Sequence, residues 1–135
     1  METFDVQSVR IAAPFDQVFG YIANPDNLPQ WTAAFKHVSK ATAQMATPGG
    51  SMEIGLRVVA TEATGTIDWF ITFPDGSVGT AFSRVIDAGK GQSVYSFVLM
   101  PPPMPLERLE GTLEVQKNTL AHELAGLKAI LEQTQ

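Results

Sequence analysis

The chain has 135 residues, of which 44% are hydrophobic and 17% are charged. This composition is typical of one globular domain with one core and excludes a disordered chain. Its 14 acidic and 9 basic residues give a net charge of −5, which argues against nucleic acids as partners because phosphate backbones are bound by clustered positive charge. There is no cysteine, which excludes disulfides, thiolate nucleophiles and cysteine-ligated metals.

The amino terminus is acidic and lacks the apolar segment of a secretory signal. No apolar run approaches the ~20 residues of a transmembrane helix. We therefore expect a cytoplasmic protein without stable membrane insertion, organised as a single domain over residues 1–135. The sequence leaves a homodimer open.

The first third of the chain predicts one strand followed by two short helices. Residues 3–11 alternate loosely between polar and apolar side chains, as a strand does. After Pro14 the apolar residues follow a helical period, and Asn24-Pro25 ends that helix because the residue before proline avoids the helical conformation. A second short helical segment is expected over residues 26–34.

Residues 35–100 alternate mostly with a period of two, which predicts a run of antiparallel strands. Turn-forming residues separate the strands at 47–50, 74–76 and 88–91. In the strand expected over residues 66–73, one face carries Ile67, Trp69, Ile71 and Phe73. Six or seven strands are expected in total.

The end of the chain predicts one long helix with an apolar stripe. Leucines recur at spacings of three and four, at Leu106, Leu109, Leu113, Leu120, Leu124, Leu127 and Leu131. The stripe has one gap, which is filled by Gln116 or Lys117. A helix of this length cannot bury its stripe alone, so we expect a sheet to curl around it. Segregated strands and helices indicate the α+β class.

Several segments carry a resemblance to a known superfamily: 13–25 (APFDQVFGYIANP), 28–31 (LPQW), 65–69 (GTIDW), 73–76 (FPDG), 84–85 (RV) and 123–128 (ELAGLK). Together they resemble a bacterial branch of the START-like superfamily, abbreviated SRPBCC. That group includes polyketide cyclases/dehydrases, lipid-transfer proteins and plant pathogenesis-related ligand carriers.

The resemblance covers nearly the whole chain and implies a helix-grip fold. In that fold a curved antiparallel sheet wraps around a long C-terminal helix, with an apolar cavity between them. The resemblance further implies a small apolar or amphipathic ligand of lipid, polyketide or aromatic type. We expect no cofactor.

Seven side chains are the predicted ligand contacts: Trp31, Phe35, Trp69, Phe82, Phe97, Met100 and Leu113. Aromatic rings offer large rigid apolar surfaces, and methionine adapts its shape to a ligand. Trp31 is the strongest candidate, because it ends a short helix near the expected entrance. The alternative is that the same side chains fill a closed core, and the sequence leaves both open.

Three polar residues are weak candidates for chemistry in the cavity. His37 shares a predicted strand face with Phe35 and would serve there as an acid or base. Arg84 shares a face with the bulky side chains of its strand and would anchor a carboxylate or ketone oxygen. Gln116 fills the gap in the leucine stripe and would orient a ligand. In the alternative, His37 lies on the surface and Lys117 reaches water from the edge of the stripe.

These candidates leave three functions open. A carrier or sensor needs only an apolar open cavity. A polyketide cyclase or dehydratase needs polar groups that converge inside it, and a closed-core regulatory partner needs no cavity at all. The two histidines have no carboxylate at a helpful spacing, so we expect no metal site.

Overall fold

The computed structural model describes residues 4–47, 50–100 and 106–133, with side chains for all of these except residue 47 and residues 106–112. The turn predicted at 47–50 lies partly outside these residues, and the prolines at 101–105 lie wholly outside them. The side chains of Leu106 and Leu109 are also outside the description.

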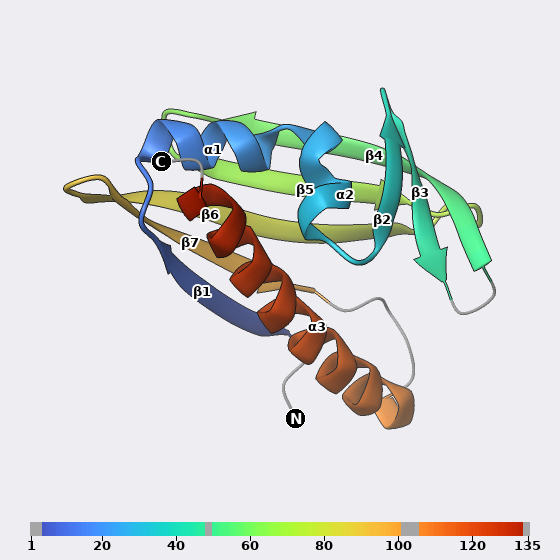
Figure 1. Ribbon diagram of the computed structural model, residues 1–135. Coiled ribbons are helices and arrows are strands. Elements are labelled where there is room, and N and C mark those ends of the chain that lie inside the picture. Colours follow the sequence, from blue (N-terminus) through green and yellow to red (C-terminus); the bar gives the residue numbers. More distant parts are fainter. Residues whose placement is uncertain (1–3, 48–49, 101–105, 134–135) are drawn as a thin grey trace.

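Seven antiparallel strands form one curved sheet (Figure 1). The strands are β1 (Asp5–Ile11), β2 (Phe35–Ser39), β3 (Thr42–Thr47), β4 (Gly50–Thr61), β5 (Thr66–Thr72), β6 (Val78–Gly89) and β7 (Gln92–Leu99). Their order in the sheet is β1-β7-β6-β5-β4-β3-β2. Each strand from β2 to β7 pairs with its neighbour in the chain, and β1 pairs with β7. The predicted antiparallel sheet is confirmed.

The helices are α1 (Phe15–Ala23), a 3-10 turn η1 (Pro25–Asn27), α2 (Leu28–Trp31) and α3 (Leu106–Gln133). The second helical segment is shorter than the predicted 26–34. It ends at Trp31, because the next residue, Thr32, has an extended backbone. The hydroxyl of Thr32 donates to the carbonyl of Leu28 at 2.7 Å. The long helix α3 crosses one face of the curved sheet, and α1 and α2 lie on the same side (Figure 1). This arrangement is the predicted helix-grip fold.

The core lies between α3 and the face of the sheet that curves around it. The leucine stripe is confirmed from residue 113 onward, because none of its members is more than 5% exposed: Leu113, Leu120, Leu124, Leu127 and Leu131. On the sheet, the predicted inward face of β5 is also confirmed, with Ile67 and Trp69 buried. The alternation of β5 and the period of α3 therefore meet in one apolar layer.

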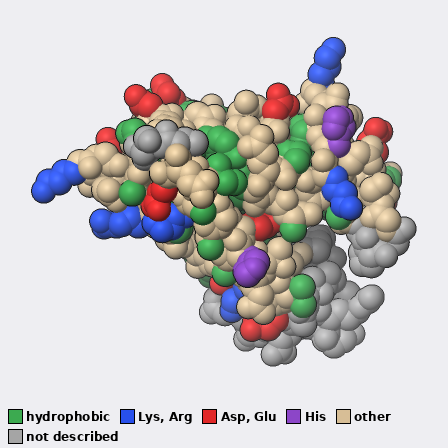
Figure 2. Space-filling view, in the orientation of Figure 1, with side chains coloured by type: hydrophobic (Ala, Val, Ile, Leu, Met, Phe, Trp, Pro, Cys, Tyr) green, Lys and Arg blue, Asp and Glu red, His purple; other side chains and the backbone are tan. Residues whose placement is uncertain are grey.

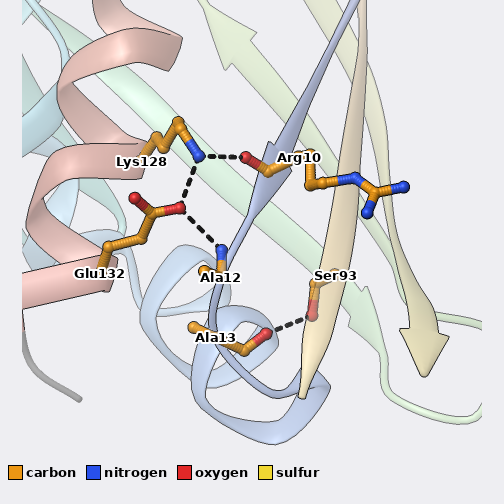
Figure 3. A network of polar contacts seen from close by, with 6 residues as sticks. All are labelled: Arg10, Ala12, Ala13, Ser93, Lys128 and Glu132. Atoms are coloured by element: carbon orange, nitrogen blue, oxygen red, sulfur yellow. Dashed lines mark hydrogen bonds and ion pairs between the residues drawn. The ribbon is translucent and has the colours of Figure 1, made fainter. Parts of the chain in front are cut away.

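A group of polar contacts ties the end of α3 to the end of β1 (Figure 3). One carboxylate oxygen of Glu132 accepts the N–H of Ala12 at 2.8 Å and the ammonium of Lys128 at 2.5 Å. Lys128 also donates to the carbonyl of Arg10 at 2.8 Å. The hydrogen bond from Lys128, followed by that from Ala12, lowers the pKa of Glu132. These contacts fix the position of α3 relative to the sheet edge.

Candidate ligand-binding cavity

The sheet, α2 and α3 surround a partly open cavity of about 370 Å³. Aromatic rings from four elements and a loop form much of its wall: Trp31, Phe35, Trp69, Phe73 and Phe97. Smaller apolar side chains complete it, among them Leu28, Ala34, Ala46, Ile71, Ala81, Leu99 and Leu120. Four polar residues also belong to the wall: Thr32, Thr80, Gln116 and Glu123. A largely apolar wall with a few polar groups is the usual make-up of a small-molecule site.

Five of the seven predicted contacts lie in this wall: Trp31, Phe35, Trp69, Phe97 and Met100. Leu113 is buried, but it lies one helical turn before Gln116 and is not part of the wall. The structure therefore places Leu113 in the core beside the cavity, and its contact with a ligand stays a prediction. Whether the other five touch a ligand stays a prediction.

The prediction that Phe82 contacts a ligand in the cavity was wrong, because Phe82 lies on the outer face of the sheet and is 37% exposed. Its ring packs edge-on against Phe70, with the centroids 6.4 Å apart. The guanidinium of Arg57 lies over the other ring of this pair, 4.4 Å from the centroid of Phe70. These contacts give Phe82 a packing role outside the cavity.

Arg84 also faces outward, so the prediction of an inward anchor was wrong. Its exposed side chain donates through Nε to the carbonyl of Thr64 at 2.9 Å. The reason lies in the phase of β6: the buried residues are Ser83 and Val85, so their neighbours in the chain face the other way. Gly79 and Ala81 lie on the inner face of β6, together with Ser83 and Val85, and line the cavity. Small residues on this face leave room for the cavity.

His37 is exposed and is not part of the cavity wall. A β-bulge in β2 explains this. Phe35 pairs with Met45, and His37, two residues further along β2, pairs with Gln44, which is only one residue from Met45 on β3. The extra residue shifts the phase of β2, so that Phe35 and Val38 contact the core and His37 does not. Both histidines of the chain appear as purple side chains on the surface in Figure 2. The prediction of an inward His37 was wrong.

Gln116 is the one chemical candidate that the structure places at the cavity. Its side-chain oxygen is buried without a hydrogen-bond partner among the described residues, and so are the indole nitrogens of Trp31 and Trp69. Lys117 instead reaches the surface, where its ammonium lies 3.6 Å from the carboxylate of Glu114. The unpaired polar atoms are notable because buried polar groups are nearly always hydrogen-bonded.

Glu123 is a cavity residue that the sequence analysis did not select. Its carboxylate accepts the backbone N–H of Ala33 at 2.6 Å, which connects α3 to the segment after α2. Burial raises the pKa of Glu123, and the hydrogen bond from Ala33 only partly opposes this effect. The signal in the sequence was its spacing: Gln116, Leu120 and Glu123 follow one another at four and three residues, so they share one side of α3.

The aromatic wall is braced by ring-to-ring contacts. The ring centroids of Trp31 and Trp69 are 6.4 Å apart, and those of Trp69 and Phe97 are 5.7 Å apart. Tyr95 stands behind them, fully buried, with its ring edge-on to Trp31 at 6.4 Å. Burial raises the pKa of Tyr95 well above its ordinary value, and its buried hydroxyl has no hydrogen-bond partner among the described residues. Tyr95 therefore stays neutral and acts as packing.

The described residues offer no metal site and no helix that is both long and apolar enough to cross a membrane. No three acidic or histidine side chains among them are placed so that they could hold a metal ion. The cavity wall contains one carboxylate and no second ionisable group among the residues described. The described part of the wall therefore offers a largely apolar surface with one ionisable group, and no paired acid and base among its residues.

No family model and no curated protein matches the chain. Solved structures do match. A START superfamily protein from Mycobacterium smegmatis shares 14% identity over 98% of this chain and 99% of its own, with a TM-score of 0.69. The Zhui aromatase/cyclase from Streptomyces shares 12% identity over 96% and 93%, with a TM-score of 0.73. The di-domain aromatase/cyclase BexL shares 15% identity over 96% of this chain and 46% of its own, with a TM-score of 0.71. The chain therefore has the START-like (SRPBCC) helix-grip fold.

Proposed function

We propose that the protein binds a small apolar or amphipathic molecule, of lipid, polyketide or aromatic type, between its sheet and α3. The observation that carries this proposal is the cavity of about 370 Å³ with a wall of packed aromatic rings. Protein cores seldom contain voids much larger than a water molecule, whereas ligand pockets begin at roughly 300 Å³. This volume argues against the closed-core regulatory partner.

Binding without chemistry is favoured over catalysis by the residues of the wall. Of the three candidates for catalysis, His37 and Arg84 face away from the cavity and Gln116 alone lies in it. The carboxyl group of Glu123, with its raised pKa, is the observation that favours a second candidate function, cyclisation or dehydration of the bound molecule. Turnover that needs Glu123 would move the proposal from carrier to enzyme.

The first test is native mass spectrometry of freshly purified protein, followed by solvent extraction of anything bound. We expect a discrete added mass that is released as an apolar or amphipathic compound. Both tryptophans of the chain lie in the wall, so the extracted compound should change their fluorescence when it is added back. An empty protein that also shows no thermal shift with apolar ligands would contradict the proposal.

A cavity-filling variant separates binding in the cavity from binding on the surface. Ala81 faces the cavity from β6, so Ala81→Leu should fill part of the space and weaken ligand binding at least about tenfold. Arg84→Ala on the outer face of the same strand and His37→Ala are the matched controls, and both should bind like the wild type. Equal affinity of Ala81→Leu and the wild type would place the ligand elsewhere.

A further inference from the structure

One negative charge stands in the cavity wall without a positive partner. Glu123 is the one ionisable residue of the wall among those described, and the other polar members are neutral. Neither of the two ion pairs found in the described residues includes it. One oxygen of its carboxylate is held by the N–H of Ala33 at 2.6 Å, and nothing on the described wall neutralises the charge. A partly buried carboxylate with one hydrogen bond is unfavourable unless a charged partner joins it.

Glu123 stands where an amphipathic ligand would place its head group. It lines the cavity and also an outer groove between α2 and α3, which it shares with Trp31 and Thr32. Several polar side chains line this groove, among them Asn118, Thr119 and the exposed His122. A ligand with its apolar body among the rings would therefore have its polar end at this boundary.

We propose that the cavity selects ligands whose head group is a protonated amine, which pairs with the carboxylate of Glu123, and that it discriminates against carboxylates. This inference rests on the proposed function. The faces of aromatic rings attract cations and repel anions, so the wall itself acts in the same direction as the carboxylate. The net charge of −5 adds a long-range attraction for cations.

The test compares three ligands with the same apolar body: phenylbutylamine, phenylbutanol and phenylbutyrate. Titration calorimetry or tryptophan fluorescence gives the affinity of each. The ammonium and the carboxylate attract each other as opposite charges, whereas the alcohol can only donate a hydrogen bond to the carboxylate, so the amine should bind at least about tenfold more tightly than the alcohol. The carboxylate should bind more weakly than the alcohol.

Two variants assign the preference to one residue. Glu123→Gln keeps the size of the side chain and an oxygen that accepts from Ala33, but removes the charge. It should lose the preference for the amine over the alcohol, whose two affinities should come within about twofold of each other in this variant. Glu114→Gln removes the same charge from an exposed position of α3 and should keep the preference.

The outcomes separate this inference from the proposed function. If the alcohol binds but the amine binds no more tightly, or if Glu123→Gln keeps the full preference, the inference is wrong and binding in the cavity stands. If the carboxylate binds as tightly as the amine, the inference is also wrong. If none of the three ligands binds, both the inference and the proposed binding site are contradicted.

Discussion

Gly65 provides a test of the packing between the β4–β5 turn and β6. It has a left-handed φ of +73°, and a Cβ atom added to it would lie 2.1 Å from the carbonyl oxygen of Val85. The N–H of Val85 also donates to the carbonyl of Gly65 at 2.8 Å, so the two backbones are held together. Gly91 has the same φ of +73° but nothing within 4 Å of the position of a Cβ. The two glycines thus differ in their surroundings and not in φ.

We expect Gly65→Ala to lower the free energy of unfolding by about 3 kcal/mol or more. Left-handed backbone costs alanine about 1–2 kcal/mol, and overlap with a packed neighbour adds about 1–3 kcal/mol. Gly91→Ala should show the first cost alone. Since small domains are stable by about 5–15 kcal/mol, both effects are measurable by urea unfolding followed by tryptophan fluorescence. Equal losses in the two variants would refute the close approach of Gly65 to Val85.

Three further predictions concern hydrogen-bonded side chains. The pKa of Glu123 is raised in the fold, so any stability that its side chain contributes is present at acid pH and lost as the pH rises. Glu123→Gln should therefore unfold at the same urea concentration as the wild type at acid pH, and at a higher urea concentration than the wild type at neutral pH. The pKa of Glu132 is lowered, chiefly by the hydrogen bond from Lys128, so its contribution to the free energy of unfolding is present above the ordinary pKa of glutamate and lost as the pH falls. The stability advantage of the wild type over Glu132→Gln should therefore shrink below about pH 4. A difference that does not change with pH would contradict either assignment. The buried hydroxyl of Ser93 donates to the carbonyl of Ala13 at 2.8 Å, so Ser93→Ala should cost about 1–3 kcal/mol in the same unfolding assay, and an unchanged midpoint would contradict that role.

Sequence patterns predicted the fold well where one face of an element is clearly apolar. The leucine spacing of α3 and the alternation of Ile67 and Trp69 on β5 both correspond to buried faces in the structure. In each case the opposite face is polar enough that the pattern indicates which face is buried. The helix-grip arrangement follows from these elements, because the stripe of α3 needs a sheet to cover it.

The same reasoning failed on β6, where both faces contain apolar residues. Phe82 and Ile86 made one face look like the core, but they are 37% and 40% exposed. The cavity lies on the other face, where Gly79 and Ala81 leave space. The rule that the face with bulkier side chains points inward applies to a strand that covers a filled core. On β6, which borders a cavity, the face with smaller side chains points inward instead.

Two other site errors have separate physical causes. The bulge in β2 adds one residue between the pairs of Phe35 and His37, and no residue type in that segment announces it. Glu123 was overlooked because a charged residue in a helix is usually solvated. Its spacing from Gln116 and Leu120 was present in the sequence, but the rule that favours apolar residues inside outweighed it.

The strand order also determines how far apart in the chain the pairing partners are. From β2 to β7 every pairing joins neighbouring strands, whereas β1 pairs with β7 through contacts such as Asp5 with Leu99. Closing so long a loop is slow, since its entropy is lost before the contacts form. We therefore expect the β2–β7 meander to form early in folding. The docking of β1, and of α3 through the contacts of Lys128 and Glu132 with the end of β1, is expected to be the late step, so the binding cavity would be completed only at the end of folding.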